Sequence, residues 1–285
     1  MDTTTWLITG TSSGLGYALA EHVLEQGDQV VLGARTLEPM AALIARYPET
    51  GFSVTLDVTD PGQRIDAIRQ AEERFGAIDV LVNNAGIDFI GAIEEQEEED
   101  YRAQFEVNFF AAAAMLRGVL PGMRERGRGT IVNISSMDGI ASLPVNGWYA
   151  STKFALEGLT EALWQEIEPI GLRAFLVEPG SFRTGIETRT KFSGPVIDAY
   201  AATSGAFREM MKTVTPEMFP GDPVRGAAAI YQVVKSDEPR HWVILGSDAH
   251  RRIGAKLDMQ RAEYDAGREL AFSTDYPGQT GPTVL

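Results

Sequence analysis

A tyrosine and a lysine stand four residues apart in the segment Tyr149-Ala150-Ser151-Thr152-Lys153. In a helix this spacing places the phenol and the ammonium group on one face. A phenol has an ordinary pKa of about 10, so it needs a neighbouring cation to exchange protons near neutral pH. Lys153 can supply that cation, and the pair therefore predicts acid–base chemistry on a substrate oxygen. Because many helices contain this spacing by chance, other motifs must support the prediction.

A glycine-rich turn, residues 9–16, follows the short apolar run Trp6-Leu7-Ile8 and reads Thr-Gly-Thr-Ser-Ser-Gly-Leu-Gly. Glycines let a backbone turn tightly and approach a ligand, and the free N–H groups at the start of the next helix favour an anion. The order of strand, glycine turn, helix and second strand is the setting of a dinucleotide site. An ordinary tight turn is the alternative, and this setting makes pyrophosphate binding the better prediction.

The second predicted strand ends in Gly33-Ala34-Arg35. In dinucleotide sites an acidic side chain at this point holds the adenosine ribose diol, whereas a nearby arginine accommodates a 2′-phosphate. Ala34 occupies the place of the acid, and the guanidinium of Arg35 can chelate phosphate oxygens in a fork. NADP(H) is therefore favoured over NAD(H). The alternative is that Arg35 is a solvated loop cation.

Short apolar runs alternate with longer segments of helical period, which indicates an α/β fold with a Rossmann-type, doubly wound parallel sheet and helices on both faces. About seven strands and six helices fit one sheet. The predicted strands are 6–8, 29–32, 52–56, 80–82, 130–134, 173–177 and 242–245, and the helices include 15–23, 40–46, 63–75, 101–126 and 149–168. Residues 1–285 are expected to form a single domain, with 181–222 as an insertion, a helical stretch at 248–270 and a loose tail at 271–285.

The composition narrows the classes of function. With 44% apolar residues among 285, the chain can bury a sizeable core. Its formal charge of −15 disfavours nucleic acid and anionic membranes as partners. It contains no cysteine, which excludes disulfides and thiolate nucleophiles and fits a cytoplasmic location. The three histidines are scattered, so we expect no metal site.

With these motifs in place, the sequence resembles the short-chain dehydrogenase/reductase family, in its branch with a single Rossmann-type domain. The resemblance runs from Thr5 to about Leu245. It rests on several motifs that occur in the family's order. They are the glycine turn, Asp57-Val58, Asn83-Asn84-Ala85-Gly86, Asn108, Ser136, Tyr149 with Lys153, and Pro179-Gly180 followed by Thr184.

The resemblance implies a role for each matching residue. Tyr149 would exchange the proton with the substrate oxygen, and Ser136 would hydrogen-bond that oxygen, with Ser135 as the competing candidate. Lys153 would hold the nicotinamide ribose and lower the pKa of the phenol. Asn108 would hold a relay water through its backbone carbonyl. The catalytic set is then Asn108, Ser136, Tyr149 and Lys153, of which Ser136 and Tyr149 also bind the substrate.

The predicted cofactor contacts come from each of these motifs. They are Gly10, Ser12, Ser13, Gly14, Leu15, Gly16, Arg35, Asp57, Val58, Asn84, Ala85, Gly86, Tyr149, Lys153, Pro179, Gly180, Phe182 and Thr184. Some NADP-preferring members of the family carry a basic residue where this chain has Ser13. The preference for NADP(H) therefore depends mainly on Arg35.

The insertion 181–222 is rich in Phe and Met, including Phe192, Phe207, Met210, Met211 and Met218, and its apolar set also contains Ile186. It can be an apolar lid over a bulky substrate or a small satellite core of its own. A lid of this kind favours a hydrophobic ketone or secondary alcohol as the substrate. The enzyme would then be a carbonyl reductase. One alternative to this enzyme is a catalytically silent, nicotinamide-sensing regulatory protein, and another is a sugar-nucleotide epimerase or dehydratase.

The resemblance also implies a homo-oligomer, a dimer or tetramer formed through the helices at 101–126 and 149–168. The acidic run Glu94 to Asp100 is expected to be solvated.

Overall fold

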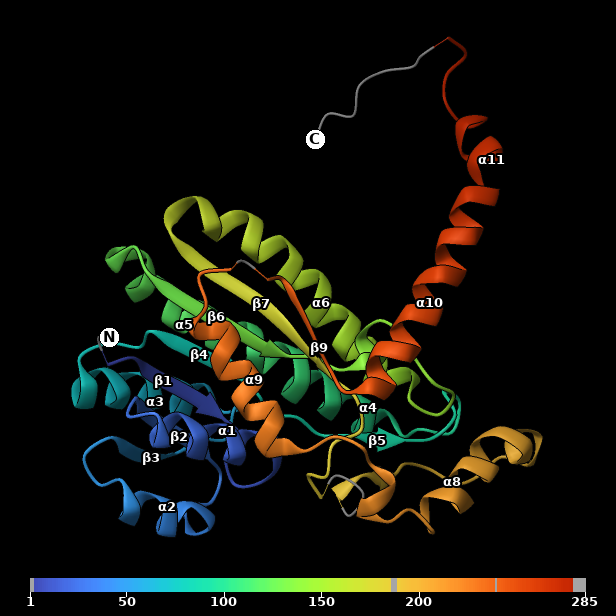
Figure 1. Ribbon diagram of the computed structural model, residues 1–285. Coiled ribbons are helices and arrows are strands. Elements are labelled where there is room, and N and C mark those ends of the chain that lie inside the picture. Colours follow the sequence, from blue (N-terminus) through green and yellow to red (C-terminus); the bar gives the residue numbers. More distant parts are fainter. Residues whose placement is uncertain (1–2, 186–188, 239, 279–285) are drawn as a thin grey trace.

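The computed structural model describes residues 3–185, 189–238 and 240–278. A seven-stranded sheet lies at its centre, with strand order β3-β2-β1-β4-β6-β7-β9 and parallel pairing throughout (Figure 1). The strands are β1 (Thr5–Thr9), β2 (Gln29–Ala34), β3 (Gly51–Thr55), β4 (Val80–Asn83), β6 (Gly129–Ile134), β7 (Leu172–Pro179) and β9 (Trp242–Leu245). The predicted Rossmann-type sheet is confirmed. The strand order reverses between β1 and β4, where such folds bind their ligands at the carboxyl ends of the strands.

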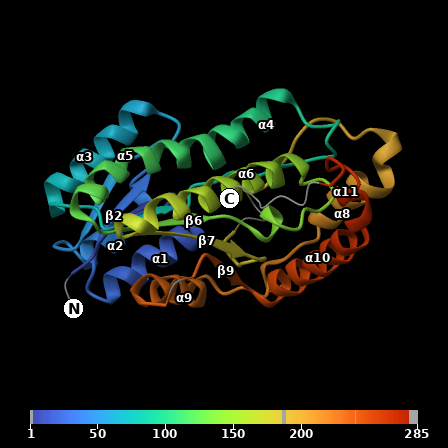
Figure 2. The same ribbon diagram turned by 90° about the horizontal axis from the view of Figure 1, so that it is seen from above.

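Helices cover both faces of the sheet, with α1 and α9 on one side and α3, α5 and α6 on the other (Figure 2). Side chains alternate between the two faces along each strand, so Trp6 and Ile8 enter one apolar core while Leu7 enters the other. The helices are α1 (Gly14–Glu25), α2 (Ala41–Arg46), α3 (Pro61–Phe75), α4 (Glu98–Phe105), α5 (Ala111–Arg126), α6 (Gly147–Ile167), α8 (Ala206–Met211), α9 (Pro223–Lys235), α10 (Ser247–Ala266) and α11 (Arg268–Phe272).

Local sequence signals define several helix ends. The Asp60 carboxylate accepts hydrogen bonds from the N–H groups of Gly62 and Gln63, and Pro61 opens α3. Asp222 and Pro223 start α9 in the same manner. Helix α5 ends at Arg126, and the next residue, Gly127, has a φ of 64° and so adopts the left-handed conformation that glycine tolerates.

Helices α8 and α9 were not predicted, and the structure departs from the predicted elements in three further places. The helix predicted at 101–126 begins at Glu98 and contains a π-helical turn, Glu106–Phe110, between α4 and α5. A short parallel pair, β5 (Phe89–Ile90) with β8 (Lys191–Phe192), joins the insertion to the segment after β4 and was not predicted. The tail predicted at 271–285 is wrong at its start, because 271–272 belong to α11. Residues 273–278 are exposed, and 279–285 lie outside the described residues.

Candidate active site

The glycine turn packs directly on the segment that follows β4. Gly10 and Gly14 have φ values of 71° and 62°, which side-chain-bearing residues rarely adopt. A Cβ atom on Gly16 would lie 2.3 Å from Asn84 Nδ2. Asn84 Nδ2 in turn donates to the carbonyl oxygens of Thr9 and Gly10, at 2.9 and 3.1 Å. Asn84 therefore holds the turn in shape, and the turn leads the chain into the N-terminus of α1 at Gly14.

The side chains predicted to lie near the adenosine end of the cofactor differ in how exposed they are. Arg35 is exposed just after β2. The Asp57 carboxylate accepts hydrogen bonds from the Thr59 hydroxyl and N–H, which lower its pKa, and the charge of Arg35 adds to this effect. Val58 is buried in the core. Only the backbone of Val58 can therefore face an adenine, whereas Arg35 is free to meet a phosphate.

Tyr149, Lys153 and Ser136 come together at the carboxyl end of β6. Lys153 Nζ lies 5.7 Å from the centre of the Tyr149 ring and donates to the carbonyl of Ile134 at 2.9 Å. Ser136 opens a short helical turn, accepts a hydrogen bond from the N–H of Asp138, and hydrogen-bonds the Tyr149 phenol. The structure therefore places an acid–base group, a cation and a hydroxyl at one point.

Burial perturbs both titrating groups of this cluster. It raises the pKa of Tyr149, the charges of Asp88 and Asp138 raise it further, and the bond with Ser136 lowers it. Burial also lowers the pKa of Lys153 to about 8, against the opposing influence of Glu157 and Asp88. Because that value lies above neutral pH, Lys153 is mainly charged at pH 7. Its cation opposes the burial that keeps the phenol protonated.

Asn108 lies in the π-helical turn between α4 and α5, and such turns often mark functional positions. Its side-chain amide pairs with the backbone of Ile87, accepting from the N–H at 2.8 Å and donating to the carbonyl at 2.9 Å. It also donates to the Thr152 hydroxyl. Asn108 thus fixes the chain after Gly86 against the helix that carries Tyr149 and Lys153.

The segment after β7 crosses the N-terminus of α1. Thr184 Cβ lies 3.1 Å from the position that a Cβ on Gly14 would occupy. The N–H of Gly180 bonds the carbonyl of Leu245, which fixes Pro179 and Gly180 at the end of β7. The ring of Phe182 is buried beside Leu15 and Gly226, so only its backbone can meet a nicotinamide. Leu15 is buried as well, so its contact with a cofactor would also come from its backbone.

Four acidic residues near the site were not singled out in the sequence. Burial raises the pKa of Asp88 to about 7, of Glu157 to about 7 and of Glu178 to about 8, and it raises that of Asp138 against the pull of Arg252. Glu157 follows Lys153 by four residues, so helical spacing could have placed it beside the lysine. Glu178 lies in β7 and is fully buried.

The acidic run preceding α4 is not fully solvated, and that prediction is wrong for Glu95. Its carboxylate is buried and accepts hydrogen bonds from the Ser204 hydroxyl and the N–H of Ile197, and it pairs with Arg208 at 3.3 Å. The later acids Glu98, Glu99 and Asp100 do occupy the first turn of α4. The insertion is thus fastened to the body by polar contacts with Glu95.

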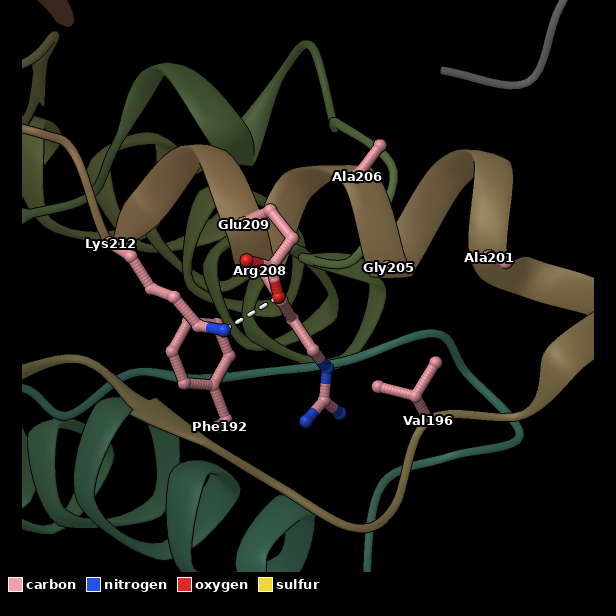
Figure 3. Close-up of a pocket in the computed structure, with 8 residues that line it drawn as sticks. All are labelled: Phe192, Val196, Ala201, Gly205, Ala206, Arg208, Glu209 and Lys212. Carbon is pink, nitrogen blue, oxygen red and sulfur yellow. Dashed lines mark hydrogen bonds and ion pairs between the residues drawn. The ribbon is translucent and has the colours of Figure 1, made fainter.

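Among the described Phe and Met side chains of the insertion, only Phe182 is buried. Phe192, Met210 and Met218 are exposed by 42%, 50% and 65%. A hollow of about 510 Å³ lies between β8 and α8. Figure 3 shows Phe192 and Arg208 on its wall and the ion pair of Lys212 with Glu209. Ile186, also predicted for this apolar set, lies outside the described residues.

Comparison with known proteins assigns the chain to a family. The model of the short chain dehydrogenase family matches residues 4–193. The chain belongs to the short-chain dehydrogenase family. Within the described residues no helix is long and apolar enough to cross a membrane, and no cluster of three or more potential metal-ligating side chains occurs.

Several short-chain dehydrogenases and oxidoreductases resemble the chain over most of its length. The protein named oxidoreductase BOA17 from Botryotinia fuckeliana is 34% identical over 270 residues, which cover 94% of this chain and 98% of that protein. A 3-ketodihydrosphingosine reductase from Bacteroides thetaiotaomicron is 35% identical and is covered to 84%, over 82% of this chain.

Solved structures agree with this assignment. The crystal structure of a short-chain dehydrogenase from Streptomyces avermitilis has a TM-score of 0.89 and 39% identity, and the match covers 96% of this chain and 100% of that one. The structure of ElxO with NADP bound has a TM-score of 0.71 and 27% identity, and the match covers 86% and 97%. The chain is therefore an oxidoreductase of the short-chain dehydrogenase type.

Proposed function

We propose that this short-chain dehydrogenase transfers hydride between NADP(H) and a ketone or secondary alcohol of hydrophobic character. The observation that carries the proposal is the meeting of Tyr149, Lys153 and Ser136 at the carboxyl end of β6. The glycine turn and the start of α1 lie at the same edge of the sheet. The arrangement combines an acid–base pair with a place for an anionic cofactor, as hydride transfer requires.

The described residues fit a dinucleotide. Ser13 is exposed before the first turn of α1, where N–H groups favour a pyrophosphate. Gly86 is exposed beside Lys153, and a Cβ at this position would lie 4.0 Å from Lys153 Nζ. The cofactor, when bound, supplies or accepts the hydride. The chain's charge of −15 opposes an anionic ligand, so attraction must come locally from Arg35, Lys153 and the α1 N-terminus.

Each catalytic residue then has a distinct task. Tyr149 donates its phenolic proton to the carbonyl oxygen during reduction and takes it back during oxidation. Ser136 donates a hydrogen bond to the same oxygen and stabilises its developing charge. Lys153 holds the ribose hydroxyls and favours the ionised phenol. Asn108 positions the helix and, through its backbone carbonyl, the relay water.

The preference for NADP(H) is supported by the exposed Arg35 and by Ala34, which leaves the strand end without an acid for a ribose diol. Arg35→Ala should weaken NADPH binding by about ten- to a hundredfold, because a charge-assisted guanidinium–phosphate contact contributes about 1.5–3 kcal/mol. NADH binding should change little. Equal affinity of the wild type for NADPH and NADH, measured by titration of protein fluorescence, would overturn the preference.

Several features support a hydrophobic ketone as the substrate. Residues 181–222 are proposed as a lid of the single domain 1–285, because Phe192, Met210 and Met218 offer exposed apolar surface. One relative bears the name of a ketone reductase. A panel of ketones followed by NADPH consumption should favour bulky apolar members. A preference for small charged keto acids would contradict the lid.

We further propose that the protein is a homo-oligomer and lies in the cytoplasm. Phe110 and Phe154, on the two helical segments proposed as interfaces, are exposed by 52% and 46%. An absence of cysteine fits a reducing compartment. Light scattering should give a dimer or tetramer, and Phe154→Glu should shift it toward the monomer. The intact set of Asn108, Ser136, Tyr149 and Lys153 argues against the silent regulatory alternative.

A further inference from the structure

Helices α10 and α11 leave the body of the molecule as a projecting arm (Figure 1). Ala249 and Ile253 are buried and anchor the first turns of α10, and Arg252 donates to the carbonyl of Ala141 at 2.7 Å. From residue 257 to residue 278 every residue except Gly267 is exposed. The arm, defined as residues 257–272, is thus helical over most of its length and surrounded largely by solvent.

A helix of this length is only marginally stable when nothing packs against it. Isolated helices shorter than about 12–15 residues are marginal in water, and helices in proteins gain most of their stability from a packed apolar face. The last turn of α10 carries Glu263 and Asp265 and contains no basic residue. The helix dipole favours cations at this end, so these acids weaken the helix further. The arm therefore needs a surface outside its own copy of the chain.

One face of the arm is apolar. Leu257 and Tyr264 are seven residues apart and Phe272 follows eight residues later, so the three side chains lie on one side of the helix. They are exposed by 51%, 74% and 60%. Met259 lies about 200° around the helix from Leu257 and belongs to another face. Large apolar side chains aligned in this way indicate that the arm packs against another protein surface.

The charges divide between the two halves of the arm and its base. Within 251–261, apart from Arg252, which pairs with Asp138, three residues are basic and one is acidic, namely Arg251, Lys256, Arg261 and Asp258. Within 262–275, four are acidic and one is basic, namely Glu263, Asp265, Glu269, Asp275 and Arg268. Two such arms in antiparallel orientation place the basic half of each against the acidic half of the other. A parallel pair would place like charges together.

A second copy of this chain is the partner that these charges fit. The whole chain carries a formal charge of −15, so the bodies of two copies repel one another. The segment 247–272 contains five acidic and five basic residues and is neutral as a whole. Two copies can therefore meet through their arms with less repulsion than through their bodies.

We propose that the arm pairs in antiparallel orientation with the arm of a second copy of the chain, with Leu257, Tyr264 and Phe272 in the contact. Each copy offers the same surface, so the contact is isologous and closes as a dimer. It is separate from the interface proposed for the helices at 101–126 and 149–168, and it does not depend on hydride transfer.

Two charge-reversed variants of the full chain test the pairing by light scattering. Glu263→Lys with Glu269→Lys makes both halves of the arm predominantly basic, and Arg251→Glu with Lys256→Glu makes both halves predominantly acidic. Each variant alone should have half the molar mass of the wild type, because like charges then face each other. An equimolar mixture of the two should recover the wild-type mass.

A matched control places the same change of net charge elsewhere. Glu49→Lys with Glu72→Lys alters exposed residues before β3 and on α3, on the opposite side of the molecule from α10, and should keep the wild-type mass (Figure 1). A second pair of variants tests the apolar face. Leu257→Asp should halve the mass, whereas Met259→Asp, on another face of the same helix, should leave it unchanged.

The proposal fails if the wild type is a monomer, if either charge-reversed variant keeps the wild-type mass, or if their mixture does not recover it. Thermal unfolding shows whether each variant is folded. If a charge-reversed variant does not fold, Leu257→Asp and Met259→Asp decide, and equal masses for these two would overturn the contact. A mass that falls in Phe154→Glu but in none of the arm variants would leave the other interface as the contact between copies.

Discussion

Removal of the Lys153 charge should be the most informative single perturbation of the site. The ammonium nitrogen lies 5.7 Å from the Tyr149 ring centre. With the phenolate charge placed at that centre and an effective dielectric constant of about 20, the two unit charges attract by about 3 kcal/mol. That energy corresponds to about two pKa units of the phenol. Lys153→Met should therefore lower kcat/KM for alcohol oxidation by about a hundredfold at pH 7 from this effect alone. Burial lowers the pKa of Lys153 to about 8, so the wild-type cation is present at that pH.

Steady-state kinetics at pH 7 measure this loss, and titration with NADPH separates it from weaker cofactor binding. Arg268→Met, on the exposed helix α11 at the outer end of the projecting helix α10 (Figure 1), removes a positive charge and should leave kcat/KM unchanged. Lys153→Arg keeps the charge and should recover part of the activity. If Lys153→Met binds NADPH and still turns over within about threefold of the wild type, the electrostatic reasoning is wrong.

Three further predictions concern catalysis, stability and the insertion. Tyr149→Phe should abolish turnover while NADPH still binds, and substantial residual reduction would refute its role as the proton donor. Burial, together with Glu157, raises the pKa of Glu178 to about 8, so the folded state holds a proton that the unfolded chain releases near pH 4.5. Stability from this group is thus present below pH 4.5 and lost as pH rises toward 8. Glu178→Gln should therefore raise Tm more at pH 9 than at pH 5, and a Tm difference independent of pH would contradict this. Glu95→Ala should speed tryptic cleavage at Lys212 by about tenfold, since it leaves Arg208 and Ser204 without their carboxylate. Unchanged cleavage would show that other contacts hold the insertion.

The sheet could be predicted from the sequence because each strand is a short apolar run bounded by helix or turn signals. Trp6-Leu7-Ile8 and the glycine turn after it gave both β1 and the start of α1. A strand that is buried on both faces is recognisable from its own run of apolar residues, without knowing which strands pair with it. The pair β5–β8 could not be found in this way. Each of its strands has two residues, and the pairing joins segments about a hundred positions apart.

In the candidate site too, residues whose relation is local in the sequence could be predicted, whereas contacts between distant segments could not. Tyr149 and Lys153 were predictable because their spacing lies within one helix, and Ser136 followed from the resemblance. The structural roles of Asn84 and Phe182 were not predictable. Asn84 supports the turn from the segment that follows β4, and Phe182 is buried by packing against α9. The burial of Glu95 depends on its contacts with Ser204 and Arg208 of the insertion. The local sequence of the acidic run contains no sign of these distant partners.

The most direct test of the central claim is NADPH consumption by the purified protein with a panel of hydrophobic ketones, followed by absorbance and by chromatography of the products. The predicted result is loss of NADPH in step with formation of the secondary alcohol, faster than with NADH and absent in Tyr149→Phe. Reduction that proceeds equally in Tyr149→Phe, or no NADPH consumption with any ketone, would contradict it.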